Sequence, residues 1–193
     1  PQHLRGQRHR GKGLIVAKPM QFTKADILKL FELLDAELAA TETHGELYLV
    51  GGAVMCLALG TRAATRDVDG WFQPVGRVRE AAVRVAHVAG VPEHWLNDAV
   101  KAWLSPHGTF NPYLERPHLQ VFVAQPEYLL AMKCMAMRLG EEFHDLDDVR
   151  YLLRFLNLTS AADALAIVSR YFAESQIPVK TRLALEELLP QES

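Results

Sequence analysis

Residues 48–72 read YLVGGAVMCLALGTRAATRDVDGWF, and this stretch decides the fold. The apolar run ELYLV, which leads into the glycines, is typical of a short strand, and we predict this strand at residues 46–50. Gly51 and Gly52 follow directly, and the next residues have the apolar character of a short, mostly buried helix that stops at Gly60. A second strand is predicted at residues 65–72. The stretch therefore predicts a strand, a glycine turn, a helix and a further strand.

Two aspartates lie in the second predicted strand, Asp67 and Asp69. Side chains alternate between the faces of a strand, so Thr65 and Trp71 are expected on the same face as this pair, and Val68 on the other. Two converging carboxylates can hold Mg²⁺ or Mn²⁺, because such ions take one or two carboxylates together with phosphate oxygens. Taken alone, the Asp-x-Asp pattern is more often a solvated strand end.

The glycine pair gives the acidic pair a context. Glycines at a strand-to-helix turn let the backbone approach a phosphate, although tight turns also use glycine for purely steric reasons. The third glycine of a dinucleotide-binding fingerprint is missing, and no Gly-Lys-Ser/Thr follows as in a P-loop. Arg62 stands between the predicted helix and strand, where it could pair with a phosphate or with Asp67 or Asp69.

Apolar spacing and capping residues predict the remaining elements. Thr23 and Ser160 are helix N-caps and Gly90 is a helix stop. The helices are expected at 23–40, 76–90, 93–104, 126–139, 143–156, 160–174 and 178–189, with a loop at 105–117 and a strand at 118–124. We therefore predict an α+β fold, in which a small mixed sheet flanked by helices precedes an all-helical C-terminal half.

The same pattern predicts the domain organisation. Residues 1–20 form a basic, flexible N-terminal tail, residues 21–125 an α/β core, and residues 126–193 a helical region packed on the core. In the predicted helix 93–104, Trp95 and Trp103 are expected to be partly buried.

The composition is that of a soluble globular protein. The 193 residues are 49% hydrophobic, 23% charged and 8% aromatic, and no stretch approaches the roughly 20 apolar residues of a membrane span. The basic N-terminus has no apolar core like that of a secretory signal. Cys56 and Cys134 both lie in apolar runs, which indicates reduced core thiols in a cytoplasmic protein.

The net charge of −2 conceals an asymmetry. Residues 1–18 carry five basic and no acidic side chains, whereas residues 19–193 carry 16 basic and 23 acidic ones, a net charge of −7. The basic segment could touch nucleic acid electrostatically, although an ordinary solvated terminus is the more frequent case.

A lysine in an apolar helix is a further candidate. Lys133 stands within LAMKCM, and lysine is almost never fully buried unless it is paired, although it could also snorkel to the surface. Asp145 and Asp148 follow 12 and 15 positions later and share a helix face, so two packed helices could bring all three together. Asp147 is expected to face solvent, and Arg138 is a weaker candidate.

Residues 48–72 resemble the phosphate- and metal-binding unit of the polymerase-beta type of nucleotidyltransferase superfamily. Residues 126–153, PEYLLAMKCMAMRLGEEFHDLDDVRYLL, look like the helical Lys…Arg…Asp…Asp stretch of the AbiEii-type, or MenT-like, toxin nucleotidyltransferases. The resemblance covers about residues 45–157. It implies a nucleotidyltransferase sheet in the N-terminal half and a site shared with the C-terminal helices.

The resemblance implies a role for each matching residue. Gly51 and Gly52 would bind the triphosphate with Arg62 and Thr65. Asp67 and Asp69 would be catalytic metal ligands. The helical lysine would contact phosphates and complete the catalytic set with two carboxylates; these residues are Lys133, Asp145 and Asp148.

One departure from the pattern concerns a third carboxylate. Many members of the superfamily carry it on a later central strand, but the predicted strand at 118–124 has no acid. Either Asp145 or Asp148 supplies the base for the attacking hydroxyl, or the attack needs little help from a base, or the enzyme is degenerate.

The resemblance implies a Mg²⁺-dependent toxin of a toxin–antitoxin system. It would transfer a nucleoside monophosphate from a nucleoside triphosphate (NTP) to an acceptor, by resemblance the 3′ end of tRNA, and a cognate antitoxin protein would be its partner. Two other readings stay open: transfer to a small molecule or a protein hydroxyl, and a non-catalytic NTP-binding or partner-binding module.

Weaker candidates complete the list. Three histidines could approach the site, although surface or loop positions are more typical; they are His107, His118 and His144. Trp71 and Trp103 could stack a base, although core packing is the commoner role of tryptophan.

Overall fold

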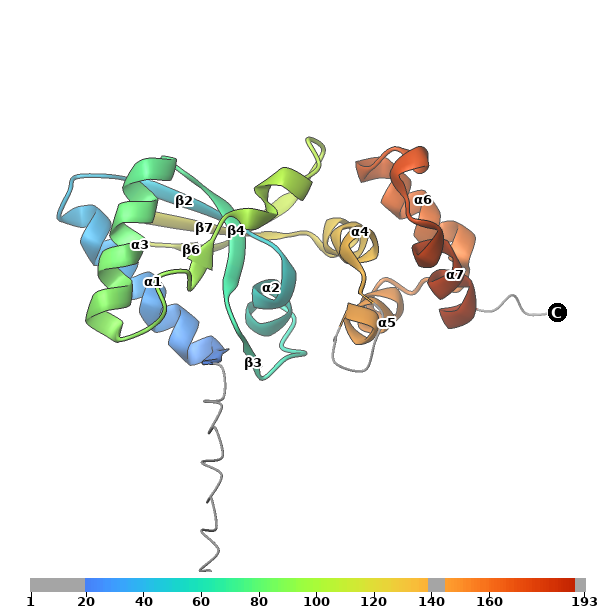
Figure 1. The fold of residues 1–193 in the computed structure, drawn as a ribbon, viewed down its shortest axis with the longest axis horizontal. Helices are drawn as coiled ribbons and strands as arrows, with labels where there is room; N and C mark the ends of the chain where they lie inside the picture. Colours follow the sequence, from blue (N-terminus) through green and yellow to red (C-terminus); the bar gives the residue numbers. More distant parts are fainter. Residues whose placement is uncertain (1–19, 139–144, 190–193) are drawn as a thin grey trace, which may run out of the picture.

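The structure, a computed structural model, describes residues 20–138 and 145–189. Its centre is a five-stranded mixed sheet in the order β5-β4-β2-β7-β6, and two further short strands, β1 and β3, pair with each other (Figure 1). The central strand β2 runs parallel to β7 and antiparallel to β4. The strands are β1 (Phe22–Thr23), β2 (Gly45–Leu49), β3 (Ala64–Thr65), β4 (Val68–Gln73), β5 (Leu96–Asn97), β6 (Phe110–Glu115) and β7 (Leu119–Ala124).

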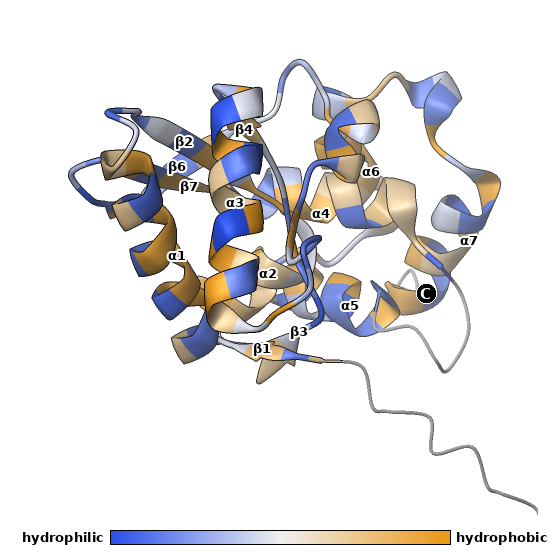
Figure 2. Cartoon of the chain, turned by 60° about the vertical axis from the view of Figure 1, so that its left-hand side comes forward, coloured by the Kyte–Doolittle hydropathy of each residue, from blue (hydrophilic) through white to orange (hydrophobic). Residues whose placement is uncertain are grey.

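Helices α1 (Lys24–Ala39) and α3 (Val75–Ala89) pack against each other on one face of the sheet. The Thr23 side chain caps α1 in a reciprocal hydrogen-bonded box with Asp26, and Gly90 ends α3 in the left-handed conformation (φ 67°), as predicted. Both helices are amphipathic (Figure 2) and bury their apolar sides. The core between helices and sheet includes Ile27, Phe31, Leu34, Leu47, Leu49, Val68, Phe72, Val78, Val85, Leu119 and Val121.

The opposite face of the sheet carries a row of stacked aromatic rings. Tyr48 on β2 lies between Trp71 on β4 and Phe122 on β7, with ring centroids 4.4 and 4.8 Å away and planes within 11° of parallel. Through Phe110 the row continues to the buried Tyr128 of the next helix. Edge-to-face and stacked aromatic contacts thus connect the sheet to the helical half.

The C-terminal half is helical, as predicted. It consists of α4 (Pro126–Ala136), α5 (Asp145–Phe155), α6 (Ala161–Tyr171) and α7 (Val179–Leu188), with a short 3-10 helix, η2 (Glu174–Gln176), before α7. Helix α4 lies at the centre of this half and packs against α5, α6 and the sheet-side helix α2 (Gly51–Leu57). Thr181 of α7 donates a buried hydrogen bond of 2.7 Å to the Cys134 carbonyl of α4.

The predicted helix at 93–104 is wrong. Leu96 and Asn97 form β5, which pairs in parallel with the start of β4, and a 3-10 helix, η1 (Ala99–Trp103), follows. Trp95 is fully buried and its indole N–H donates to the Ala82 carbonyl at 3.0 Å, whereas Trp103 is 75% exposed. The helical spacing of this segment is overridden by pairing with the sheet.

The predicted loop at 105–117 contains β6, the edge strand paired with β7. The edge position accommodates Pro112, because a proline cannot donate to a second ladder, and the register shifts between Pro112 and Leu114. The predicted strand at 65–72 is divided into β3 and β4, with residues 66–67 between them. Within residues 20–138 and 145–189, no helix has the length and apolar character needed to cross a membrane.

Candidate functional site

All nine predicted site residues line one cavity of about 1010 Å³. Its walls come from the α2 turn, the segment around β3 and the start of β4, and from α4 and α5 across the cavity. The sequence-predicted residues among its lining are Gly51, Gly52, Arg62, Thr65, Asp67, Asp69, Lys133, Asp145 and Asp148. The structure thus brings together two groups of residues that lie more than 60 positions apart in the chain.

The glycine turn packs closely against the acidic strand and its neighbours. Gly51 has φ +67°, and a Cβ there would lie 3.4 Å from Oδ2 of Asp69. At Gly52 a Cβ would lie 2.8 Å from Oγ1 of Thr65 and 3.0 Å from Nη1 of Arg62. Any side chain at Gly52 would therefore push into the space that these polar groups share, and the glycines leave the backbone accessible there.

Asp69 is a mostly buried carboxylate whose charge is opposed by burial and by Asp67 and favoured by Asn97, Lys133 and Arg138. The Nδ2 of Asn97 donates to its Oδ1 at 2.8 Å. Burial raises the pKa of Asp69 and the neighbouring charge of Asp67 raises it further, while the Asn97 hydrogen bond acts in the opposite direction. Two adjacent acids under such conditions favour a bound cation, so Asp67 and Asp69 fit the donor set of Mg²⁺ or Mn²⁺.

Thr65, Asp67 and Asp69 do not share one strand, contrary to the prediction, because Asp67 lies between β3 and β4. Thr65 lies in β3 opposite Phe22, is buried, and donates from Oγ1 to the backbone oxygen of Asp67 at 3.2 Å. The hydroxyl therefore holds the short connection between β3 and β4 that carries Asp67. Asp69 and Trp71 do share a face of β4 opposite the buried Val68, as predicted.

Three cations and two carboxylates form a charged cluster, to which α4 and α5 and the segment before β3 contribute. Lys133 is buried, and its Nζ lies 2.7 Å from Oδ2 of Asp148 and 3.4 Å from Oδ1 of Asp145. Arg62 donates to both oxygens of Asp148, with Nε 3.0 Å from Oδ1. Arg138 donates from its Nε to Asp145 at 2.9 Å and from its backbone N–H at 3.2 Å. The cluster has a formal charge of +1.

These contacts identify the ion-pair partners of Arg62, Asp145 and Asp148. Arg62 binds Asp148 rather than Asp67 or Asp69, which the sequence had offered as partners. Burial raises the pKa of Asp145, but the hydrogen bonds and charges of Arg138 and Lys133 outweigh burial, and the net shift is downward. Asp145 is thus held ionised as a partner for cations, and Asp147 is exposed, as predicted.

No third metal-ligating side chain joins the acidic pair within the part of the chain that the structure describes, where no group of three or more His, Cys, Asp or Glu residues could hold a metal ion. Strand β7 carries no acid, as its sequence indicated. The two α5 carboxylates, Asp145 and Asp148, were the alternative that the sequence offered, and both are engaged by basic side chains.

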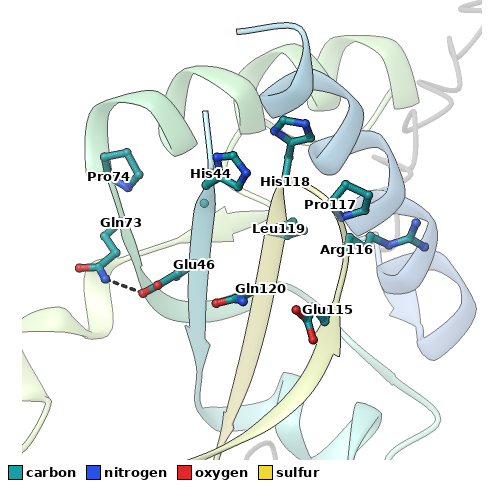
Figure 3. Close-up of a pocket in the computed structure, with 11 residues that line it drawn as sticks. His44, Glu46, Gln73, Pro74, Glu115, Arg116, Pro117, His118, Leu119 and Gln120 are labelled. Atoms are coloured by element: carbon teal, nitrogen blue, oxygen red, sulfur yellow. Dashed lines mark hydrogen bonds between the residues drawn. The ribbon is translucent and has the colours of Figure 1, made fainter. Parts of the chain in front are cut away.

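The histidine and tryptophan candidates among the described residues, His107, His118, Trp71 and Trp103, do not line this cavity. His107 is exposed, and His144 lies outside the described residues. The ring of His118 lies 4.7 Å from that of His44 and is tilted by 31° to it, in a second cavity. That cavity opens at the other end of β2, where a polar row crosses four strands (Figure 3): Gln73, Glu46, Gln120 and Glu115. It contains none of the predicted site residues.

Two residues that line or support the site were missed from the sequence. Asn97 was hidden in the segment predicted as a helix, where nothing indicates contact with Asp69. Tyr151 lines the cavity from α5, one helical turn after Asp148, and this spacing was the available signal. The basic residues of segment 1–18 lie outside the described residues. The sequence matches no protein-family model, no curated protein and no solved structure.

Proposed function

We propose that the protein is a Mg²⁺- or Mn²⁺-dependent nucleotidyltransferase that transfers a nucleoside monophosphate from an NTP to an acceptor and releases pyrophosphate. One observation carries the proposal: a glycine turn, an acidic pair and a buried lysine–arginine cluster line the same cavity. Acids that bind a metal ion and cations that bind phosphates are the two requirements of phosphoryl-type transfer.

The acidic pair would hold the metal ion, and the accessible backbone at Gly51 and Gly52 would accommodate the triphosphate. A bound Mg²⁺ neutralises charge that develops on the phosphates during transfer. Its fit rests on Asp69, whose buried charge beside Asp67 has the Asn97 amide as its neutral partner. The aspartates are thus placed where a divalent cation lowers their mutual repulsion.

Lys133 and Arg62 would bind phosphate oxygens. Asp148 contacts both of these cations and Asp145 contacts Lys133, so we assign the α5 carboxylates to positioning rather than to proton abstraction. The acceptor hydroxyl oxygen attacks the α-phosphorus, the bond to the bridging oxygen breaks, pyrophosphate leaves, and the hydroxyl proton passes to water. Catalysis of this kind depends mostly on orientation and preorganised charge.

We propose the 3′ end of tRNA as the acceptor, so that transfer blocks translation, with a cognate antitoxin as protein partner in the cytoplasm. The support is the resemblance of residues 48–72 to the nucleotidyltransferase superfamily and of residues 126–153 to its toxin members, together with the basic character of residues 1–18. Five basic side chains without an acid favour contact with a nucleic acid backbone.

The test uses the full chain, MgCl₂ and each of the four NTPs labelled at the α-phosphate. Separate reactions contain total tRNA, total protein and a pool of small-molecule acceptors. We expect label in the tRNA fraction, and a loss of at least about 100-fold in the rate for Asp67→Asn and for Lys133→Met. Glu80→Gln, an exposed carboxylate on α3, is the matched control with unchanged rate.

Each pool gives a distinct answer. Label in the protein or small-molecule pool and none in tRNA would contradict the proposed acceptor while supporting the chemistry. Mg²⁺-dependent NTP binding without transfer to any pool would contradict the proposed activity and indicate a nucleotide-binding module.

A further inference from the structure

Tyr151 stands out in the site cavity because it is the one aromatic side chain among the described residues that line it. The rest of the lining consists of glycines, small or aliphatic side chains, methionines and the charged and polar groups described above. An aromatic ring in such a cavity offers a flat surface that charged ligands such as phosphate or Mg²⁺ do not use.

The position of Tyr151 on α5 relates it to the phosphate-binding wall. Asp148, Tyr151 and Phe155 stand at helical spacing i, i+3 and i+7, so they form one stripe along the helix. Asp148, at the beginning of the stripe, holds Lys133 and Arg62. The backbone of Tyr151 lies one helical turn further along the axis, which is about 4.5 Å. Tyr151 therefore lines the cavity beside the cluster that contains Lys133 and Arg62.

Phe155, which does not line the cavity, packs against the Tyr151 ring. The two rings are stacked with centroids 5.9 Å apart and planes 24° from parallel. Phe155 is 49% exposed, one of the large hydrophobic side chains that the described chain leaves in solvent. Its contact with Tyr151 restricts the orientation of that ring. Within residues 20–138 and 145–189 the Tyr151 hydroxyl makes no hydrogen bond, so the ring is held by packing.

We propose that Tyr151, backed by Phe155, is the surface on which the nucleobase of the NTP stacks. The inference rests on the proposed function, because it places the phosphates at Lys133 and Arg62. A nucleobase is joined to the α-phosphate through one ribose, so it has to lie on the flank of the phosphate site. Stacking on an aromatic ring tolerates any base, because every base has a π face. The ring therefore contributes affinity for nucleotides in general, without a preference for one base.

The test compares two ligands that share the phosphates and differ in the base. Binding of ATP, CTP, GTP or UTP and of inorganic tripolyphosphate to the full chain is measured by calorimetry in MgCl₂. We expect the wild type to bind NTPs more tightly than tripolyphosphate. Tyr151→Leu should bind NTPs about 5- to 150-fold more weakly, the range of a lost base–aromatic stack, and bind tripolyphosphate unchanged.

Two further variants separate stacking from structural effects. Tyr151→Phe keeps the ring and should restore NTP affinity, which excludes the hydroxyl as the determinant. Trp103→Leu removes an aromatic ring that is 75% exposed and does not line the cavity, so it should leave both affinities unchanged.

The outcomes distinguish this inference from the proposed function. Equal weakening of NTP and tripolyphosphate binding in Tyr151→Leu would overturn the inference and indicate a structural role for the ring. Unchanged NTP binding in that variant would overturn it as well, as would weakened binding of a single-stranded RNA ending in CCA without any change in NTP affinity. If the wild type binds neither ligand, the phosphate site itself is wrong and both proposals fall.

Discussion

Arg62 and Asp148 lie 86 positions apart in the chain and form a two-pronged ion pair on the wall of the site cavity. Arg62 comes from the segment between α2 and β3, and Asp148 from the first turns of α5. Because Asp148 also binds Lys133 of α4, one carboxylate joins the sheet side of the site to two helices of the C-terminal half. The two halves of the chain thus contribute to a single charged cluster.

Removal of Lys133 tests how strongly this cluster contributes to stability. Lys133→Met preserves the apolar stem but leaves two buried carboxylates without their shared cation. Because Asp148 keeps Arg62 and Asp145 keeps Arg138, we expect a loss of about 1.5–3 kcal/mol in the free energy of unfolding, the range for a hydrogen bond to a charged group. Urea denaturation followed by circular dichroism measures it.

The matched control is Lys29→Met on α1. Lys29 pairs with Glu32 at 2.8 Å, but both side chains are more than half exposed, so no measurable change is expected. Equal effects of the two variants would show that the buried cluster adds nothing beyond a surface ion pair.

Removing the charge of Asp69 should increase the stability of the folded protein. Its raised pKa, caused first by burial and then by Asp67, means that stability decreases as the pH rises from the ordinary aspartate pKa through the raised folded value. At neutral pH without divalent ions, Asp69→Asn should therefore unfold at the same or a higher temperature than the wild type, and the Asn97 contact can persist.

Mg²⁺ should reverse this order. Millimolar MgCl₂ is expected to raise the melting temperature of the wild type, because a ligand that binds only the folded state stabilises it, and to raise that of Asp69→Asn less. Differential scanning fluorimetry gives both shifts. An identical Mg²⁺ response in the two proteins would argue against the acidic pair as the metal site.

Asp145 predicts a different pH dependence. Its pKa is lowered overall, because Arg138 and Lys133 outweigh the effect of burial. A lowered folded pKa gives stability that is complete above the unfolded aspartate pKa and is lost as the pH falls through the folded value. The wild type should lose stability as the pH falls below the ordinary aspartate pKa, and Asp145→Asn should show a shallower slope there. Parallel slopes in acid titrations of the two proteins would contradict the assignment.

Gly70 tests the packing of the sheet beneath the site. A Cβ at this position would lie 2.4 Å from the backbone oxygen of Tyr48, so the β2–β4 ladder would have to shift. Gly70→Ala should destabilise the protein by about 1–3 kcal/mol, the range of overpacked cores. Gly76→Ala, with nothing within 4 Å of its Cβ on helix α3, should be neutral or slightly stabilising. Urea midpoints that fall equally for both would show that backbone preference, not the clash, is responsible.

The features that could be predicted from the sequence are those with local causes. The Thr23 cap, the Gly90 stop and the spacing of apolar residues determine α1 and α3. The pairing of Lys133 with Asp145 and Asp148 could be anticipated because a lysine within an apolar helix needs a carboxylate partner when it is buried. Helical spacing places Asp145 and Asp148 on one face of α5, and the packing of α4 on α5 brings that face to Lys133.

What could not be predicted depends on partners distant in the sequence. Strand β5 has two residues and forms because β4 offers an edge, and β6 contains a proline that local rules assign to a loop. The ion pair of Arg62 with Asp148 crosses 86 positions, so no local pattern indicates it. Asn97 reaches Asp69 through that same short β5 pairing.

The aromatic row and the shared cavity have a consequence for any attempt to divide the chain. A cut at residue 125 would separate the glycine turn and the acidic pair from Lys133 and Tyr151, and would break the ring contact between Phe110 and Tyr128. Neither fragment would carry all the residues that line the site cavity, and each would expose apolar surface that the other covers. Recovery of activity would therefore require the two fragments to reassociate, so the chain lends itself to a split reporter.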